Sequence, residues 1–432
     1  MAHRPRAALL APPANRTRSP LMLNVTYLCV PPLGGLRTFY TNLRKGLSSH
    51  SIELFWLACG KSESALATQQ LTGEASHGCI VAPDSDDPVT RARALIEYIH
   101  DRQIRVVLLN SVANPVTTGI AFHLPREIRR ILIVHSITPM TYRTARALRE
   151  YVHATVCPSP RMRADLVRHH GFDRCWTPCV AHGVDTATFD EIQRPERDGG
   201  PLRLLFLGRV EDAAKGVFWL PAILERAMRG GADVRLTVAG DGPDRTELRA
   251  RMFRSGVESR VDFLGAVARE QVPTLAAGHD LFLMPSRFEG LPFSLLEAMA
   301  AGCVPVCSKL RGVTDFVVEH GRTGLLFPLG SVRLAAEHVA RLSSNRPLLA
   351  AMSAAARQEV RARFNVDQQA ERYAALIRRV LQAPRVIHNP LPVEPWSSPR
   401  GFRPGWWYWL PTPVKNALRV ARERLPLAAR QP

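Results

Sequence analysis

The sequence predicts an α/β protein made of two domains, each built on a parallel sheet, followed by a C-terminal tail. Two observations predict this class. Short apolar runs that suit buried strands alternate with amphipathic stretches that suit helices, in both halves of the chain. A polar, glycine-containing stretch from Gln193 to Gly200 separates the two alternating series. At 432 residues the chain is long enough for each domain to bury its own core.

The organisation of the chain follows from where its composition changes. Pro12 and Pro13 interrupt the apolar part of the N-terminus too early for a signal peptide. We therefore expect a disordered leader (1–20), a first α/β domain (21–185), a linker (186–200), a second α/β domain (201–365), a closing helix (366–382) and a basic tail rich in proline and tryptophan (383–432).

Each predicted domain alternates strands with helices. In the first half we expect strands at 22–28, 52–58, 106–109, 131–135, 154–157 and 179–181, with helices at 36–48, 91–100, 141–152 and 162–170. In the second half we expect strands at 202–207, 234–238, 261–264, 281–284, 304–307 and 325–327, with helices between them and two further helices at 346–364 and 367–381.

Composition limits the classes of partner. The net charge of +19 indicates a polyanionic neighbour, either nucleic acid, an anionic membrane surface or a phosphorylated substrate. The chain has no zinc-finger spacing and no aromatic RNA-binding signature, so we expect no nucleic acid. No apolar run is long enough to span a membrane. The eight scattered cysteines suit small buried hydrophobes in a reducing cytosol, although metal or redox use stays open.

The stretch from Pro285 to Leu310 carries the most specific pattern. A strand is followed by a loop containing Glu289 and Gly290, then by a helix from Pro292 to about Ala301 that ends at Gly302. A helix N-terminus of this kind attracts anions through its backbone N–H groups and its dipole. The interpretation is that the helix faces a diphosphate, Glu297 the ribose and Glu289 a sugar; the alternative is an ordinary strand–helix unit with two solvated glutamates.

Other predicted strand ends carry further candidates. In the first half, Gly34-Gly35 lets a backbone approach a phosphate closely, and His135 ends a predicted parallel strand, although Gly-Gly turns and structural histidines are both common. In the second half, Arg209 offers a fork of donors and Lys215 a point charge for phosphate oxygens. The glycines at 240 and 242 indicate a tight turn rather than a phosphate cradle.

Together these residues resemble the retaining glycosyltransferases of family four, which have the two-domain GT-B fold. The resemblance covers roughly residues 24 to 381 and is strongest from 202 to 330. It is carried by Gly208-Arg209 with Lys215-Gly216, the Gly240-Asp241-Gly242 turn, Glu289 and Glu297 within FEGLPFSLLEAMAAGCVPV, and Gly183-Val184-Asp185.

The resemblance implies a fold of two Rossmann-like parallel-sheet domains facing a cleft, and a retaining hexosyl transfer from a nucleotide-diphosphate sugar. It implies that the leaving phosphate accepts the acceptor's proton and that no metal cofactor is required. The implied catalytic residues are Arg209 and Lys215 on the diphosphate, and Glu289 and His135 on the sugar. The implied donor-binding residues are Gly34, Gly35, Gly290, Leu291, Pro292 and Glu297.

The implied acceptor is a glycan or a lipid-linked molecule in polysaccharide or cell-envelope synthesis. Two positions differ from the family's pattern. Arg37 is an additional charge close after the glycine pair, and His182 stands where the family often has Asn. Two other functions remain open. One is a catalytically idle scaffold that binds a sugar nucleotide or glycan, and the other is a sugar-nucleotide epimerase on the same architecture.

The tail holds four of the chain's seven tryptophans, Trp396, Trp406, Trp407 and Trp409. In the stretch from Val414 to Leu425, apolar residues share one helical face. Aromatic residues beside a basic amphipathic helix suit the surface of an anionic membrane. Two interpretations stay open: peripheral attachment of a cytoplasmic protein to the inner face of the membrane, or a strap in which the tryptophans pack on the core.

Overall fold

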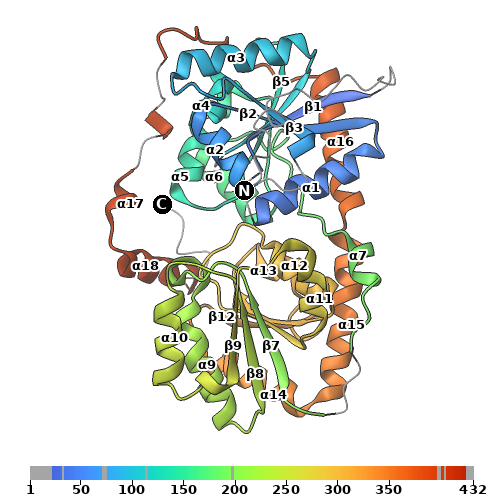
Figure 1. Cartoon of the computed structure of the whole chain (residues 1–432), viewed down its shortest axis with the longest axis vertical. Coiled ribbons are helices and arrows are strands. Elements are labelled where there is room, and N and C mark those ends of the chain that lie inside the picture. Colours follow the sequence, from blue (N-terminus) through green and yellow to red (C-terminus); the bar gives the residue numbers. More distant parts are fainter. Residues whose placement is uncertain are drawn as a thin grey trace, which may run out of the picture. The chain divides into compact units, whose positions relative to one another are not determined.

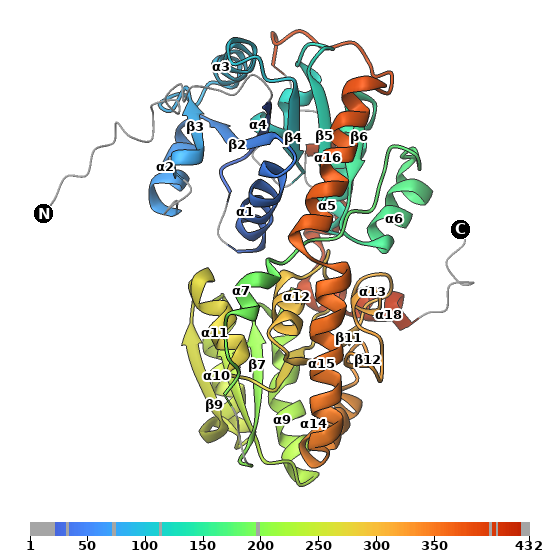
Figure 2. The same cartoon turned by 90° about the vertical axis from the view of Figure 1, so that its right-hand side faces the viewer.

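The computed structural model describes residues 22–31, 34–70, 75–111, 115–195, 199–396, 400–402 and 405–424, and the expected leader lies outside them. The chain divides into two compact units, both drawn in Figures 1 and 2. The first unit runs to Pro158 and adds Met162–Gly183 and Val366–Gly405. The second unit combines Ser159–Arg161 with Val184–Asn365 and resumes at Trp406.

The first unit is built on a sheet of six strands in the order β3-β2-β1-β4-β5-β6, and every pair in it is parallel. Because β1 lies between β2 and β4, the chain order reverses at β1, which makes the carboxyl ends of β1 and β4 a switch point where ligands bind in such sheets. The strands are β1 (Leu23–Leu28), β2 (Ile52–Cys59), β3 (Gly78–Val81), β4 (Val106–Asn110), β5 (Arg129–Ile133) and β6 (Ala154–Val156).

Helices cover both faces of this sheet. On one face, apolar residues of α3, α4, α5 and α6 join those of the strands in one buried cluster. On the other face, Phe39 and Tyr40 of α1 pack against Tyr27 of β1, and Tyr373 of α16 packs against Phe39. The helices are α1 (Gly35–Ser48), α2 (Lys61–Gln70), α3 (Pro88–Asp101), α4 (Pro115–Gly119), α5 (Pro139–Leu148), α6 (Pro160–His170) and α16 (Val366–Gln382).

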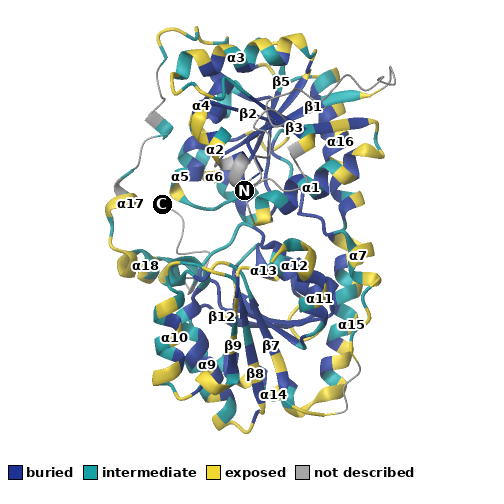
Figure 3. Ribbon diagram, in the orientation of Figure 1, coloured by how far each residue is buried: buried dark blue, intermediate teal, exposed yellow. Residues whose placement is uncertain are grey.

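The second unit repeats this plan with the order β12-β11-β10-β7-β8-β9, again with parallel pairs throughout. Its switch point lies between β7, the first strand of the unit, and β10. Nearly all residues of the central strands are buried, so these strands are dark blue in Figure 3. The strands are β7 (Leu202–Leu207), β8 (Val234–Ala239), β9 (Val261–Gly265), β10 (Leu281–Met284), β11 (Val304–Lys309) and β12 (Leu325–Pro328).

Apolar residues of α9, α10 and α14 pack with the strands of the second sheet in one cluster, and α12 packs between α11 and α15. The longer helices are α9 (Leu220–Arg229), α10 (Arg245–Arg254), α11 (Val272–Ala277), α12 (Phe293–Ala300), α14 (Val332–Ser344), α15 (Arg346–Arg363) and α18 (Thr412–Arg424). The short ones are α7 (Thr186–Asp190), α8 (Asp212–Lys215), α13 (Thr314–Val317) and α17 (Trp406–Trp409).

Several sequence-based boundaries were wrong. Residues Cys179–Ala181 form no strand, because only Cys179 pairs with a neighbour, in an isolated bridge to Cys157. Strand β5 ends at Ile133, so His135 lies in the loop beyond the strand rather than at its last position. The expected helix at 141–152 ends at Leu148 and continues only as a 3₁₀ turn. The sequence analysis missed β3 and α2, and the region taken as a linker begins with α7.

The first part of the tail packs on the first unit as a strap. Backbone N–H groups of His388 and Leu391 donate to the carbonyls of Glu150 and Phe122, and Arg385 forms an ion pair with Glu150. The ring of Trp396 lies 4.8 Å from that of His123. The strap interpretation is therefore correct for this part of the tail, whereas α17 and α18 belong to the second unit.

Within the part of the chain that the structure describes, no helix has the length and apolarity needed to cross a membrane. The same described residues contain no group of three or more His, Cys, Asp or Glu side chains arranged to hold a metal ion. Six of the eight cysteines are buried, while Cys175 is exposed and Cys179 is half-buried; all are free thiols.

The close packing of α1 against α16 in the first unit gives a test of the fold. A Cβ atom at Gly46 would lie 2.6 Å from Cβ of Ala370 and 2.9 Å from Cγ1 of Val366. We expect Gly46→Ala to lower the free energy of unfolding by about 1–2 kcal/mol, because overpacking outweighs the gain in helix propensity of at most ~1 kcal/mol. Chemical denaturation measures the change.

The matched control is Gly119→Ala in α4. Its backbone is helical, and an added Cβ would meet only the ring of Trp396, at an ordinary contact distance of 3.5 Å. We expect this variant to unfold within about 0.5 kcal/mol of the parent or to be slightly more stable. Equal effects at the two positions would contradict the packing argument.

Candidate functional site

Two loops meet at the switch point of the second sheet. The loop after β7 runs from Gly208 to the short helix α8, and the loop after β10 runs from Pro285 to the start of α12. Both follow the carboxyl ends of neighbouring parallel strands, so they lie at one edge of the sheet. Most of the residues that the sequence analysis selected lie on these two loops.

A glycine allows the loops to approach each other. Gly216 ends α8 with φ of 62°, in the left-handed region that favours glycine. A Cβ atom there would lie 2.2 Å from the carbonyl oxygen of Pro285. The backbone of one loop therefore touches that of the other directly after Lys215, which fixes where the lysine side chain begins.

An ion pair joins the loops. Nζ of Lys215 donates to Oε1 of Glu289 at 2.7 Å, and Oγ of Ser286 donates to the same oxygen at 2.7 Å. The Lys215 and Glu289 side chains are 22% and 10% exposed, so the pair is shielded from water but still accessible. Both of these bonds use Oε1, which leaves Oε2 of Glu289 as a further acceptor for a ligand hydroxyl.

A second pair, which the sequence analysis missed, lies beneath the first. Nη2 of Arg287 forms an ion pair with Asp212 at 2.8 Å, and its Nε donates to the carbonyl of Asp212 at 2.9 Å. The guanidinium lies 3.8 Å from the ring centroid of Trp219, and the backbone N–H of Arg287 donates to the carbonyl of Ala214. Both charged side chains are largely buried, so this pair holds the loops rigidly.

Arg209 lies on the loop after β7 but is separate from this cluster. Its side chain is 66% exposed and its Nε lies 3.5 Å from Oε2 of Glu211. None of the hydrogen bonds or ion pairs described for it reaches Lys215 or Glu289. An exposed guanidinium with a weak partner remains available to a phosphate, and its role stays a prediction.

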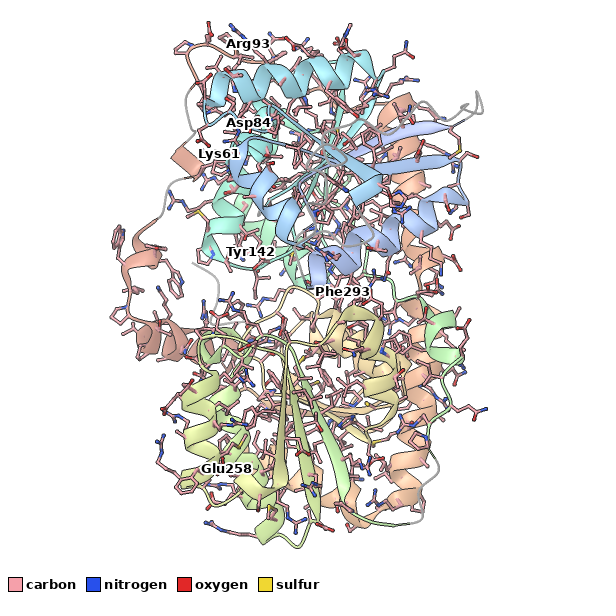
Figure 4. All side chains as sticks on the ribbon, viewed as in Figure 1. Lys61, Asp84, Arg93, Tyr142, Glu258 and Phe293 are labelled. Carbon is pink, nitrogen blue, oxygen red and sulfur yellow. The ribbon has the colours of Figure 1, made fainter. Side chains whose placement is uncertain are left out.

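The N-terminus of α12 opens onto the same loop; Figure 4 labels Phe293, its first residue. The sequence predicted Pro292 in the first turn of α12, and this was wrong. Pro292 is the N-cap residue, with an extended ψ of 122°. Proline has no side-chain acceptor, so Pro292 does not cap the first turn of α12 through its own side chain. The segment Gly290–Pro292 thus leads into a helix end whose dipole favours an anion.

Glu297 lies one turn into α12 with its side chain half-buried. Burial desolvates the carboxylate and raises the pKa of Glu297 to about 7, although Arg269 counteracts part of the shift. A carboxyl group with this pKa is partly protonated at neutral pH, when no ligand is bound. Hydroxyl donors from a ribose would favour its charged form.

The turn at 240–242 has a structural role. Gly240 has φ of 138°, and a Cβ atom there would lie 1.9 Å from the carbonyl oxygen of Gly208. A Cβ at Gly242 would lie 2.3 Å from the carbonyl of Val210. The turn therefore packs against the backbone of the loop that carries Arg209, which agrees with the tight turn expected from the sequence.

In the first unit, Gly34 and Gly35 follow β1 at that sheet's own switch point. Gly34 is the N-cap of α1 with φ of 93°, and the space around its missing Cβ is open to 4 Å. Both glycines are exposed. The start of α1 thus presents uncovered backbone, as the interpretation of a phosphate contact requires.

His135 lies in the loop after β5, packed edge-on against Phe39 at 4.7 Å and stacked with His182 at 5.8 Å. Burial lowers the pKa of His135 to about 3, and it lowers the pKa of His182 well below its ordinary value. Nε2 of His135 is buried and has no hydrogen-bond partner among the described residues. A neutral imidazole with an unused nitrogen suits hydrogen bonding to a hydroxyl rather than proton transfer at neutral pH.

The structure therefore brings Lys215 and Glu289 into contact and places Gly290, Leu291, Pro292 and Glu297 on the segment that follows. Arg209 lies at the same sheet edge without contacting the pair. Gly34, Gly35 and His135 belong to the first unit. No sequence signal distinguished Arg287 or Asp212 from other surface charges, because their partnership joins residues 75 positions apart.

Comparison with known proteins identifies related sequences in both units. The family model described as Glycosyltransferase Family 4 matches residues 33–188, and that described as Glycosyl transferases group 1 matches residues 201–345. The first range contains Gly34, Gly35 and His135, and the second contains all the candidates of the second unit. The region from 346 to the C-terminus, including α18, lies outside both matches.

The names of the curated relatives describe enzymes that transfer sugars. A GDP-mannose-dependent α-(1-6)-phosphatidylinositol monomannoside mannosyltransferase of Mycobacterium tuberculosis is 34% identical over 210 residues, which are 45% of this chain and 54% of the relative. The match thus spans about half the length of that protein. A D-inositol 3-phosphate glycosyltransferase of Pseudarthrobacter chlorophenolicus is 27% identical, over 68% of this chain and 78% of the relative.

Solved structures share the architecture. HepE of Anabaena, in complex with UDP and glucose, has a TM-score of 0.66 at 17% identity, covering 83% of this chain and 99% of HepE. Sucrose-phosphate synthase of Thermosynechococcus elongatus has a TM-score of 0.67 at 16% identity, covering 84% and 100%. Together with the two parallel sheets, this likeness confirms the predicted fold class of two Rossmann-like domains.

The raised pKa of Glu297 predicts how stability depends on pH. The folded protein holds this proton up to about pH 7, whereas the unfolded chain releases it near pH 4.5. The carboxyl group therefore reduces stability progressively from about pH 4.5 to 7, and the loss persists above that range. We expect Glu297→Gln to gain about 2 kcal/mol relative to the parent on going from pH 4.5 to 8, after allowance for partial exposure.

Denaturation at a series of pH values measures this difference, with Glu337→Gln on α14 as the control. Glu337 is more exposed and pairs with Arg333 on its own helix, so its substitution should change stability by a similar small amount at each pH. A difference between Glu297→Gln and the parent that does not vary with pH would contradict the desolvation of Glu297.

Proposed function

Because the chain belongs to glycosyltransferase family 4, the glycosyl transferases of group 1, we propose that it moves a sugar from a nucleotide-diphosphate sugar to a glycan or a lipid-linked acceptor. The observation that carries the proposal is the contact between Lys215 and Glu289 at the switch point of the second sheet. A cation, a carboxylate and the N-terminal end of a helix dipole lie on these two loops, and Glu297 follows on that helix; together they suit the diphosphate, the sugar hydroxyls and the ribose of such a donor.

Charge stabilisation is the main requirement of the reaction. Cleavage of the bond between sugar and phosphate leaves additional negative charge on the diphosphate. We assign Lys215, Arg209 and the N–H groups that open α12 to stabilise this charge, because preorganised donors in a partly desolvated site act most strongly on charge that develops in the transition state. These groups provide the positive charge without a metal ion, so we propose a reaction that needs no metal cofactor.

The remaining residues orient the donor. We assign Glu289, with the backbone of Gly290, Leu291 and Pro292, to the hydroxyls of the sugar, and Glu297 to those of the ribose. In the first unit we assign Gly34 and Gly35 to the phosphates and neutral His135 to a sugar hydroxyl. The unused Nε2 of His135 supports this role. None of these side chains is placed to attack the sugar in this scheme.

We further propose that the anomeric configuration is retained. The departing phosphate oxygen takes the proton of the acceptor hydroxyl, and the acceptor oxygen bonds to the anomeric carbon on the face that the phosphate leaves. Ordering of both substrates on one face replaces a protein nucleophile in this scheme. The transferred group is a hexosyl residue, as in the mannosyltransferase relative.

The named substrate of that relative, a phosphatidylinositol monomannoside, supports a lipid-linked acceptor for this chain. We accordingly propose a role in cell-envelope or polysaccharide synthesis, with the protein in the cytoplasm and held peripherally at the inner face of the plasma membrane. The net charge of +19 favours an anionic membrane surface in this location.

Donor binding and turnover test the function. We expect one or more UDP- or GDP-sugars to raise the melting temperature of the full chain. Lys215→Ala should lower kcat about 10²–10³-fold, because it removes one charge that stabilises the transition state. Glu289→Ala should abolish the selectivity among sugars. Lys309→Ala, which removes an exposed lysine at the end of β11, is the control and should behave as the parent.

The products distinguish the alternatives. Transfer gives free nucleoside diphosphate and a glycosylated acceptor whose anomeric configuration NMR identifies, and excess EDTA should not slow it. An isomerised donor without released nucleotide would indicate an epimerase instead. Binding of the donor without turnover, across a panel of lipid and glycan acceptors, would favour an idle scaffold.

A further inference from the structure

The C-terminal helix α18 exposes its apolar residues. Among the described residues, nine large hydrophobic side chains are exposed, and four of them lie within eleven positions: Tyr408, Trp409, Val414 and Leu418, with exposed fractions of 62%, 77%, 43% and 46%. Ala417 and Ala421 are exposed too. In a helix, residues 414, 417, 418 and 421 share one face, so α18 presents a continuous apolar stripe beside two exposed aromatic rings.

The opposite face of α18 is polar and holds the helix to the second unit. Glu423 forms an ion pair with Arg161 and accepts on its carbonyl from Arg311 at 3.0 Å. Arg419 donates to the carbonyl of Ala213 at 3.0 Å. Val420 adds an apolar contact on this side, against a small cluster around Leu310. The helix therefore turns its polar face toward the second unit and its apolar face outward, whereas a helix that covers a core turns its apolar face inward.

We propose that the surface formed by Tyr408, Trp409, Val414, Ala417, Leu418 and Ala421 docks onto an anionic lipid bilayer. This deepens the peripheral location proposed above by naming its contact surface. One ion pair and hydrogen bonds from Arg311 and Arg419 fix α18 on its polar side, so the apolar stripe stays directed outward. Tyrosine and tryptophan favour the interface between lipid headgroups and acyl chains, and an apolar helix face inserts at the same depth.

The positive charge of the helix and of the whole chain favours an anionic membrane, rather than a second copy of the chain, as the partner of this surface. The helix contains Lys415, Arg419, Arg422 and Arg424 against the single acid Glu423, and the whole chain carries a net charge of +19. Two copies meeting at this surface would bring like charges together, whereas an anionic membrane is complementary to them. Lys415 lies 5.9 Å from the Tyr408 ring, at the border of the stripe, where its ammonium meets headgroup phosphates.

Vesicle flotation tests this surface. The full chain should float with vesicles of phosphatidylglycerol and phosphatidylcholine and bind pure phosphatidylcholine at least tenfold more weakly. The double variant Trp409→Ser/Leu418→Ser should lose at least tenfold in binding to the anionic vesicles, because it interrupts the stripe. The matched control is Phe253→Ser/Leu264→Ser, which removes two other exposed hydrophobics of the second unit, 71% and 51% exposed.

Parent-like binding by the double variant, or no preference of the parent for anionic vesicles, would overturn the proposal. Sedimentation velocity without lipid provides a further outcome: self-association that the double variant abolishes would assign the surface to a second copy. Flotation needs no sugar donor, so its failure is distinguishable from failure of the proposed transferase function.

The inner face of α18 carries an independent inference. The guanidinium of Arg419 lies 4.0 Å from the ring centroid of Phe288 and donates to the carbonyl of Ala213. Phe288 precedes Glu289, and Ala213 lies two residues before Lys215. One side chain from outside both family matches thus contacts the two loops whose residues form the central ion pair.

We infer that Arg419 is a positioning residue, which holds the loops after β7 and β10 so that Lys215 and Glu289 remain paired before a donor binds. This inference rests on the proposed function of that pair. Arg419 itself is half-buried and stacked, with Asn416 on its own helix as a further partner. Its contribution is therefore geometric, and it should affect donor binding more than the chemical step.

We expect Arg419→Ala to raise KM for the nucleotide sugar about tenfold while kcat changes less than about twofold. Arg419→Lys should recover part of the loss, since an ammonium stacks on Phe288 but lacks the planar fork. The control is Arg379→Ala in the first unit, which removes a similar stacking contact, 3.9 Å from the Trp176 ring, together with a hydrogen bond to the carbonyl of Cys175. It should leave KM unchanged.

Equal effects of Arg419→Ala and Arg379→Ala on KM would overturn this inference, as would an unchanged KM in Arg419→Ala. Thermal melting of both variants without donor separates loss of loop geometry from general destabilisation. If the parent itself binds no nucleotide sugar, the proposed function fails. If the parent binds a nucleotide sugar and Arg419→Ala binds it equally well, only the inference about Arg419 fails.

Discussion

One ion pair, between Lys215 and Glu289, sets the arrangement of the candidate site. It joins the loops that follow β7 and β10, the two strands between which the chain order of the second sheet reverses. Gly216 permits the pair by bringing its loop against the carbonyl of Pro285, and the Arg287–Asp212 pair beneath fixes the loops a second time. These contacts hold the ammonium of Lys215 on Glu289, in the segment that leads into α12.

The pair also explains how the site tolerates a concentrated charge before a donor is present. A lysine and a glutamate that are 22% and 10% exposed each lose hydration, and each compensates the other. A diphosphate offers Lys215 a second anionic partner, while sugar hydroxyls offer Glu289 new donors. In the proposed function, donor binding would therefore replace one set of charge-assisted hydrogen bonds by another and leave neither charge unpaired.

Much of the fold followed from sequence because strands in parallel sheets are apolar over their whole length. The second unit's strands were predicted to within about two residues for this reason. The four residues GCIV of β3 were too short to distinguish from a loop, and α2 has hardly any amphipathic pattern. The strand predicted at Cys179–Ala181 was wrong for the opposite reason: Val180 and Ala181 are apolar and buried, but only Cys179 pairs with a neighbouring segment.

The residues of the candidate site were also only partly predictable from the sequence. The positions of the glycines, Lys215 and Glu289 were predictable because these residues lie on segments that follow apolar strands, and parallel strands bring their carboxyl ends to one edge. Arg287 and Arg419 were not, because their roles depend on partners 75 and 206 positions away. A local pattern predicts which face a residue lies on, but only the folded chain determines which guanidinium stacks on which ring.

The C-terminal helix links the two inferences through its two faces. Leu418 and Arg419 are consecutive, yet the side chain of Leu418 is exposed and that of Arg419 contacts the loops after β7 and β10. A surface that immobilises α18 would also restrict Ala213 and Phe288, which reduces the ordering left for a donor to impose. Coupling of this kind is reciprocal, so a bound donor would tighten attachment by the same factor as attachment tightens donor binding. In the proposed function, such a helix would favour transfer where a lipid-linked acceptor is present.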